Sequence, residues 1–231
     1  MDAEKYNRQL QEFVSQNTQL RPEFAHYYTQ PMLQDDTSLT GFDTHYVYHV
    51  AWAIGKINAA PPSGHVDFAS SLHFCTAISS VTSTTFVDYR PASLYMDNLT
   101  CVAGDLTDKT QWEGHSYPSV SCMHVVEHIG LGRYGDQLDV NGDIKAMNNL
   151  KNLVADGGRL LFVVPVGKPS IFFNAHRVYS AKWIAEFFSD SFKLNEFYFI
   201  PGPTEQKPIL NCDLNRADDF SYGCGCFEFL A

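Results

Sequence analysis

The chain has 231 residues, a formal net charge of −10 at pH 7 and an apolar fraction of 45%, with 17 Phe and 12 Tyr. This composition indicates a compact protein with a large core and argues against disorder. The acidic charge excludes broad binding to nucleic-acid backbones, which needs Lys and Arg to displace counterions. No apolar run reaches the ~18 residues of a membrane helix, and the polar start over residues 1–19 is unlike a secretory signal, so we expect a cytoplasmic protein without a membrane span.

The first part of the chain is predicted to be helical. Residues 4–19 form a polar, weakly amphipathic helix, and residues 20–41 are irregular. A second helix covers residues 42–59 and ends at Pro61-Pro62-Ser63-Gly64. We therefore expect an N-terminal helical extension over residues 1–60 and a larger domain over residues 61–231.

Strand-like and helical segments alternate from residue 65 onward. Strands are predicted over residues 65–68, 84–87, 100–102, 119–124, 159–164, 193–200 and 224–230. The clearest later helices cover residues 144–154 and 181–188. This order predicts an α/β fold with a doubly wound, mainly parallel seven-stranded sheet. The last two strands have no obvious helix between them and predict an antiparallel hairpin at the sheet edge.

Three acidic residues, Asp67, Asp88 and Asp105, lie at the ends of the first three predicted strands. Ligands of open α/β sheets gather beyond the carboxyl ends of the strands. Asp88 follows Asp67 at about the ~20-residue offset at which an acid meets a ribose in dinucleotide folds. The alternative is that each acid only caps the helix that follows.

The loop after the first strand, Ala69-Ser70-Ser71, lacks the glycines with which backbone amides approach a pyrophosphate. A cofactor without pyrophosphate tolerates small side chains there. S-adenosylmethionine has a ribose and an adenine but no phosphate, and its sulfonium charge suits an acidic site. The sequence therefore favours this cofactor over a dinucleotide.

From about residue 64 to the end, the order of elements resembles class I S-adenosylmethionine-dependent methyltransferases. The resemblance implies that Asp67 lies near the amino-acid moiety of the cofactor, that Asp88 binds the ribose, and that Asp105 and Leu106 lie near the adenine. The other cofactor-binding residues that it implies are Ala69, Ser70, Ser71, Tyr89 and His124.

Four blocks narrow this resemblance to an uncharacterised methyltransferase-like domain family. They are His65-Val-Asp-Phe-Ala-Ser-Ser-Leu72, Val87-Asp-Tyr-Arg-Pro91, the segment from His124 to Asp136, and Phe173-Asn-Ala-His-Arg-Val178. Members of that family often accompany polysaccharide-synthesis enzymes. The resemblance therefore implies a glycan acceptor.

His124, Glu127 and His128 form a compact cluster that has three interpretations. Side chains three and four residues apart converge on a helical turn, and imidazole with carboxylate suits a divalent metal such as Mn, Fe, Co or Zn. The spacing is similar to the E-x-x-E-H motif of metal-dependent O-methyltransferases, whose RNA-modifying members add a downstream histidine, matched here by His176. Alternatively, His128 or His176 is a metal-free general base, or Glu127 and His128 only hold the loop.

The same residues match the H-x-x-E-H signature of zinc peptidases, which must lie in a long helix, whereas a strand and a turn are predicted here. Arg133, Tyr134 and Asp136, with Asn174 and Arg177, carry groups that bond sugar hydroxyls, although the arginines can equally pair with local acids. Cys212, Cys224 and Cys226 lack paired C-x-x-C spacing and are expected to pack in the core.

These features lead to one main hypothesis, an S-adenosylmethionine-dependent O-methyltransferase acting on a sugar hydroxyl, for example of a deoxyhexose such as rhamnose in a glycan. A divalent metal, Mn or Mg or a similar ion held by His124, Glu127, His128 and His176, would grip adjacent hydroxyls. The catalytic residues would be Glu127, His128 and His176. A non-catalytic glycan- or partner-binding domain is the alternative, and a homodimer or a place in a larger glycan-synthesis protein is left open.

Overall fold

The computed structural model describes residues 2–21, 24, 28–202 and 207–231. The chain divides into two compact units, Met1–Phe42 and Asp43–Ala231. The first unit contains helix α1 (Ala3–Leu20), and Lys5 in that helix forms an ion pair with Asp36 across 2.7 Å. Among the described residues, no helix combines the length and the hydropathy needed to cross a bilayer.

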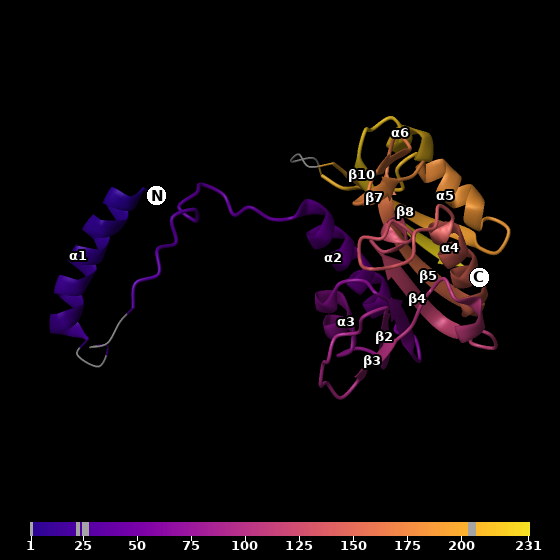
Figure 1. The fold of residues 1–231 in the computed structure, drawn as a ribbon, viewed down its shortest axis with the longest axis horizontal. Coiled ribbons are helices and arrows are strands. Elements are labelled where there is room, and N and C mark those ends of the chain that lie inside the picture. Colours follow the sequence, from indigo (N-terminus) through magenta and orange to yellow (C-terminus); the bar gives the residue numbers. More distant parts are fainter. Residues whose placement is uncertain (1, 22–23, 25–27, 203–206) are drawn as a thin grey trace. The chain divides into compact units, whose positions relative to one another are not determined.

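The second unit alternates strands and helices (Figure 1). Its helices are α2 (Thr44–Ala59), α3 (Leu72–Ile78), α4 (Gly142–Leu153), α5 (Ala181–Phe188) and α6 (Leu214–Asp218), with 3-10 turns η2 (Lys109–Gln111) and η3 (Val126–His128). Its strands are β1 (His65–Phe68), β2 (Thr84–Asp88), β3 (Leu99–Ala103), β4 (Tyr117–Met123), β5 (Val154–Val166), β6 (Ser170–Phe172), β7 (His176–Val178), β8 (Lys193–Pro201), β9 (Ile209–Leu210) and β10 (Gly223–Leu230). All the predicted strands are present, and β6, β7 and β9 are short additions.

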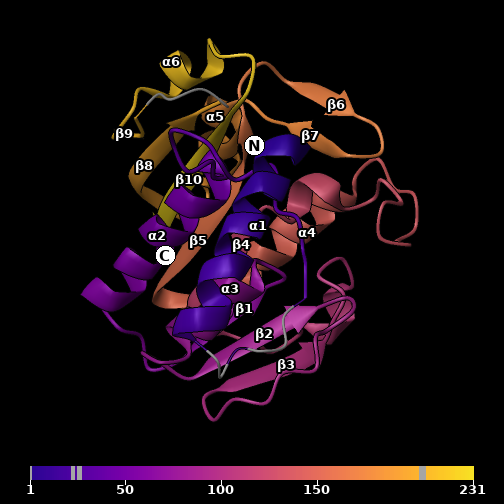
Figure 2. The same cartoon turned by 90° about the vertical axis from the view of Figure 1, so that its left-hand side faces the viewer.

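The central sheet has the strand order β3-β2-β1-β4-β5-β10-β8-β9, and β6 and β7 form a separate hairpin (Figure 2). Strands β1 to β5 pair in parallel, whereas β10 pairs antiparallel with both β5 and β8. The mainly parallel α/β sheet with a reversed final strand is therefore confirmed, with β9 as an eighth strand. The predicted antiparallel pairing of the last two main strands is also confirmed, since β10 pairs with β8 toward one end of the sheet, with β10 lying between β5 and β8 and β9 outermost.

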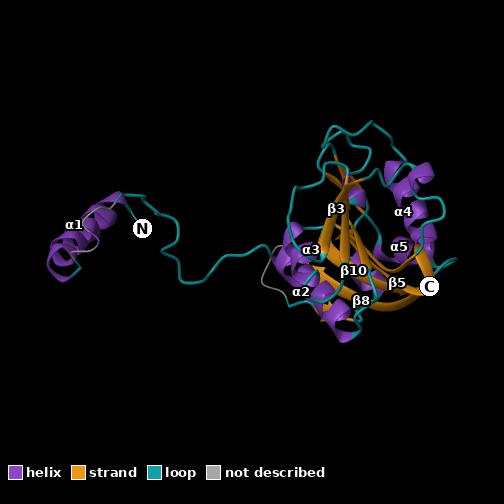
Figure 3. Cartoon of the chain, turned by 90° about the horizontal axis from the view of Figure 1, so that it is seen from below, coloured by secondary structure: helices purple, strands orange, loops and turns teal. Residues whose placement is uncertain are grey.

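Helices cover both faces of the sheet, with α2 and α3 on one face and α4 and α5 on the other (Figure 3). Ala53 and Ile57 of α2 are fully buried and belong to one hydrophobic cluster with Leu161 and Val163 of β5. Lys56 of α2 also forms ion pairs with Glu196 and Glu228 at 2.8 and 3.0 Å. The structure therefore groups α2 with the sheet, whereas the sequence-based boundary after residue 60 assigns it to the extension.

Candidate active site

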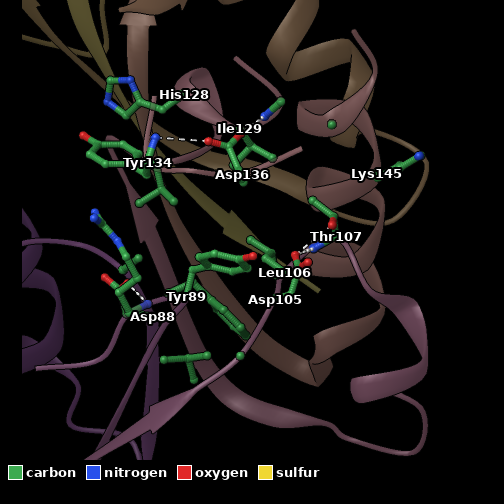
Figure 4. A pocket seen from close by; sticks show the side chains of 18 of the residues that line it. Asp88, Tyr89, Asp105, Leu106, Thr107, His128, Ile129, Tyr134, Asp136 and Lys145 are labelled. Atoms are coloured by element: carbon green, nitrogen blue, oxygen red, sulfur yellow. Dashed lines mark hydrogen bonds between the residues drawn. The ribbon is translucent and has the colours of Figure 1, made fainter. Parts of the chain in front are cut away.

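A pocket of about 480 Å³ opens beyond the carboxyl ends of strands β1 to β4 (Figure 4). The predicted site residues that line it are Ala69, Asp88, Tyr89, Asp105, Leu106, His124, His128, Tyr134 and Asp136. They come together because parallel strands end at the same edge of the sheet. The acids after β2 and β3 thus share one pocket with the histidines after β4.

Asp88 and Asp105 are each held in place through one oxygen. Asp88 Oδ1 accepts the backbone N–H of Arg90 at 2.7 Å, and Asp105 Oδ1 accepts the N–H and the hydroxyl of Thr107 at 2.8 and 2.7 Å. Within the described part of the chain, the Oδ2 atom of neither carboxylate has a protein hydrogen bond. Each acid therefore keeps one acceptor oxygen for a ligand.

Asp67 does not line this pocket, and neither do Ser70 and Ser71. Asp67 is fully buried in β1, where it accepts hydrogen bonds from the Ser121 hydroxyl and the Ser70 N–H. Burial raises the pKa of its carboxyl to about 6, although the bonds from Ser121 and Ser70 oppose that rise. Ser71 instead caps α3, since its side chain accepts the N–H of Phe74. Asp67 and Ser70 therefore join β1 to β4, Ser71 caps α3, and none of the three lines the pocket.

Ala69 lies on the pocket side of this loop with a left-handed backbone, φ +51°. This is the region of backbone space that favours glycine. The loop therefore has a backbone conformation typical of glycine at Ala69, although this residue carries a Cβ atom.

The turn after β4 divides the histidine–carboxylate cluster into two parts. His124 has φ +57°, and its Nδ1 donates to Glu127 Oε1 at 2.8 Å. Glu127 is buried, with 1% of its side chain exposed, so it supports His124 and does not line the pocket. Burial by itself lowers the pKa of the His124 imidazole, but Cys224 and Glu127 beside it raise that pKa above its usual value.

His128 lines the pocket, and within the described ranges its Nε2 makes no hydrogen bond, with Glu127 Oε1 3.8 Å away. Its Nδ1 lies 2.6 Å from the carbonyl oxygen of Ala175, and because a carbonyl only accepts, Nδ1 carries the proton. In neutral His128 this leaves Nε2 as a proton acceptor. The ring of Tyr134 meets His128 edge-on at 5.7 Å, and Figure 4 shows the two side chains together.

The metal set predicted from sequence does not converge. The Glu127 oxygen nearest to His128 already accepts the His124 Nδ1 proton at 2.8 Å, and His176 packs against Phe172 and Tyr222, with ring centroids 5.1 and 5.7 Å away. Within the described ranges, the one group of three or more potential ligands whose donor atoms all lie within 4.8 Å of one another is a different one, His45, His124 and Cys224. The four predicted ligands therefore do not fit a single ion.

The surroundings of His124 also exclude the peptidase geometry. His124 precedes a single 3-10 turn, η3, that follows strand β4. The H-x-x-E-H signature needs a long helix to bring its two histidines to one face. The motif therefore matches in sequence letters only.

The residues predicted to bind a sugar fall into three groups: those that line the pocket, those that do not line it, and the buried Arg177. Tyr134 and Asp136 line the pocket, but the Asp136 carboxylate also accepts the N–H groups of Gly130, Gly132 and Tyr134, so it holds the glycine loop. Arg133 and the exposed Asn174 do not line it, and Arg133 donates to the Ala175 carbonyl at 3.1 Å.

Arg177 has a structural role, which was the alternative to sugar binding predicted from the sequence. Its guanidinium is buried, donates to the carbonyl of Ile129 at 2.7 Å and lies 3.6 Å from Asp143. It therefore ties β7 to the turn after η3, and its place as a substrate contact is not supported by this geometry.

Several lining residues were not predicted from the sequence, among them Arg90, Thr107, Gln137, Asp139 and Lys145. Asp139 and Lys145 form an ion pair at 2.6 Å at the start of α4. The available signal was the acidic segment before that helix, from Asp139 to Asp143. Its direction toward the pocket follows from the packing of α4 on the sheet.

Comparisons of the chain with known proteins show which fold it has. A family model described as "Caenorhabditis protein of unknown function, DUF268" matches residues 93–199. No curated protein matches the chain. Among solved structures, the chain is similar to the N-methyltransferase NodS from Bradyrhizobium japonicum WM9 in complex with S-adenosylhomocysteine, with a TM-score of 0.59, 13% identity, and 85% of this chain and 92% of that chain covered.

Two further enzymes have similar folds. The Burkholderia thailandensis 1,6-didemethyltoxoflavin-N1-methyltransferase, solved with S-adenosylhomocysteine, has a TM-score of 0.56 and 12% identity and covers 100% of this chain and 90% of that chain. Coclaurine N-methyltransferase, also bound to S-adenosylhomocysteine, has a TM-score of 0.58 and 9% identity and covers 84% and 75%. At such low identity these similarities concern the fold, and the second unit therefore has the Rossmann-like fold of class I methyltransferases.

Proposed function

We propose that this chain is an S-adenosylmethionine-dependent methyltransferase that methylates a hydroxyl group of a sugar. The observation that carries the proposal is that Asp88 and His128, which come from different strand ends, line one pocket of a methyltransferase fold. An acid suited to a ribose and a histidine suited to proton removal thus share one cavity.

The cofactor half of the pocket fits a nucleoside. Asp88 keeps an acceptor oxygen for the ribose hydroxyls, and Leu106 offers an apolar contact for the adenine beside Asp105. Ala69 lies where the amino-acid part of the cofactor would pass. When bound, S-adenosylmethionine supplies an electrophilic methyl group on a positively charged sulfur.

His128 is the proposed general base. The Ala175 carbonyl holds its Nδ1 proton, so Nε2 accepts the proton of an acceptor hydroxyl that lies beside Tyr134. Glu127 and His176 are not assigned this role, because Glu127 is buried against His124 and His176 does not line the pocket. This arrangement supports O-methylation without a metal held by Glu127, His128 and His176.

The acceptor side of the pocket supports a sugar. Its lining includes the aromatic ring of Tyr134 and the polar side chains of Gln137 and Lys145. One apolar surface with several directional polar groups suits a polyhydroxylated ring. The four sequence blocks that carry the family resemblance support a glycan-synthesis setting for this activity.

Calorimetry with S-adenosylhomocysteine tests the cofactor site. We expect stoichiometric binding, and we expect Asp88→Ala to weaken it roughly 10- to 100-fold, since hydrogen bonds to a charged group are worth about 1.5–3 kcal/mol. Asp156→Ala is the matched control, because Asp156 is an exposed acid outside the pocket. Absence of binding by the unaltered protein would end the proposal.

Turnover on a panel of deoxyhexosides and other sugars tests the catalytic part. We expect His128→Gln to lower methyl transfer by about 10²- to 10⁴-fold while the affinity for S-adenosylhomocysteine stays the same. Cofactor binding without transfer to any acceptor would instead identify a non-catalytic binding domain.

A further inference from the structure

Three potential metal ligands converge behind the pocket from three separate elements. His45 lies in the first turn of α2, His124 follows β4, and Cys224 lies in β10. Their donor atoms all lie within 4.8 Å of one another, and no other such group occurs among the residues that the structure describes. The predicted metal set shared only His124 with this group.

The closest pair already has the spacing of two ligands on one ion. His124 Nε2 lies 3.4 Å from Cys224 Sγ. A tetrahedral zinc ion with Zn–N of about 2.0–2.1 Å and Zn–S of about 2.3 Å separates two such donors by roughly 3.6 Å. Binding therefore needs little change in this pair.

The imidazole of His124 is oriented as in protein metal sites. Its Nδ1 donates to the buried carboxylate of Glu127 at 2.8 Å, which fixes the ring and orients Nε2 toward Cys224. Carboxylate–histidine pairs of this kind hold metal-bound histidines and raise their basicity. A metal ion on His124 would therefore account for the buried carboxylate of Glu127, which does not line the pocket.

Unpartnered nitrogens surround the same point. The Nε2 atoms of His45 and His49 are buried and have no hydrogen-bond partner among the described residues. His49 donates its Nδ1 proton to the His45 carbonyl at 2.7 Å, and its ring lies 5.0 Å from that of His124. Buried polar atoms without partners are costly in folded proteins and call for an explanation such as an ion.

We propose that His45, His124 and Cys224 bind one zinc ion, with the fourth position taken by a ligand from outside the chain. Two imidazoles and a thiolate are nitrogen and sulfur donors, which favour zinc over the oxygen-preferring Mg²⁺ or Mn²⁺. Binding releases the thiol proton of Cys224 to solvent as the Zn–S bond forms. The ion joins α2, the turn after β4 and β10, and so fixes the wall of the pocket that His124 lines.

The test uses the full chain, stripped of metal with a chelator, and zinc or cobalt as the probe. We expect one zinc ion per chain, a rise in Tm of roughly 5–10 °C at about a hundred times Kd, and a sulfur-to-cobalt charge-transfer band with Co²⁺. Cys224→Ala should remove the band and weaken zinc binding at least 100-fold, and His45→Ala should weaken it similarly.

Cys226→Ala is the matched control, because Cys226 is equally buried on the same strand but is not in the ligand group. It should keep both the band and the stoichiometry. Retention of tight zinc binding by Cys224→Ala, or the absence of a cobalt–thiolate band in the unaltered protein, would overturn the proposal. The second observation needs no variant, so it decides even if a substitution impairs folding.

Discussion

At the scale of single residues, two left-handed positions shape the pocket. Ala69 and His124 end neighbouring parallel strands with φ values of +51° and +57°. Non-glycine residues are uncommon in this region, and such positions gather at functional sites, where the surrounding structure holds them. Both residues line the pocket, so the strained backbone lies where the ligand would bind.

Ala69 permits a direct prediction. Glycine adopts a positive φ without the steric cost that a Cβ atom causes, although it also gains freedom in the unfolded chain. We therefore expect Ala69→Gly to raise the free energy of unfolding by about 1 kcal/mol in urea titrations. Ala77→Gly, at an exposed position of the regular helix α3, should lower it by about 0.5–1 kcal/mol. Equal losses in both variants would show that Ala69 carries no strain.

At this scale the sequence predicted the pocket residues only in part. Asp88 and Asp105 could be found because they end strands, and strand ends share one edge. Asp67 lies in the same type of position, but its side chain points into the sheet toward Ser121, which only the pairing of β1 with β4 reveals. His45 and Cys224 could not be found as partners of His124, because the contact depends on where α2 and β10 pack.

At the scale of elements, the strand-like segments that alternate with helical ones identified the main strands correctly. The strands β6, β7 and β9 are two or three residues long, too short to show a periodic pattern. The insertion of β10 between β5 and β8 is a long-range pairing that no local signal encodes. Helix α2 was predicted from the sequence, but its packing against the sheet was not.

The role of α2 leads to a prediction about cooperativity. Ile57 is fully buried against the sheet, so Ile57→Ala should lower the free energy of unfolding by about 2–5 kcal/mol. Val47→Ala, at a half-exposed position of the same helix, should change it by no more than about 0.5 kcal/mol. Tryptophan fluorescence and circular dichroism should give one shared transition. An unchanged main transition in Ile57→Ala would instead make α2 an independent extension.

At the scale of the whole molecule, a buried polar chain crosses the centre of the parallel sheet. The two ring nitrogens of His65 bond the hydroxyls of Ser119 and Ser121 at 2.8 and 2.9 Å, and Ser121 in turn donates to Asp67. These residues lie on β1 and β4, directly beneath the pocket. Because β1 and β4 are central strands, a charge on any of these hydrogen-bonded side chains affects the stability of the entire second unit.

The pKa values of the two titratable side chains in this hydrogen-bonded series, His65 and Asp67, shift in opposite directions. Burial, helped by Arg159, lowers the pKa of His65 to about 3, and burial raises the pKa of Asp67 to about 6. Between pH 3 and 6.5 the unfolded chain binds a proton at His65 that the folded protein does not, so His65 makes stability increase with pH. Asp67 acts the other way between about pH 4 and 6, because there the folded protein holds the extra proton.

His65→Gln separates the two effects, because glutamine keeps hydrogen-bonding groups for the serines but does not titrate. We expect the free energy of unfolding of the unaltered protein, minus that of the variant, to rise with pH by up to about 1.4 kcal/mol per unit between pH 4 and 6. The difference should become constant above about pH 7, where the imidazole is neutral in both states. In the variant the residue at position 65 no longer titrates, so the contribution of Asp67 to the pH dependence of the free energy of unfolding remains, and it should have the opposite sign. Urea titrations from pH 4 to 8 in the presence of a chelator measure both curves, and parallel curves would mean that His65 is protonated to the same extent in the folded and unfolded chain.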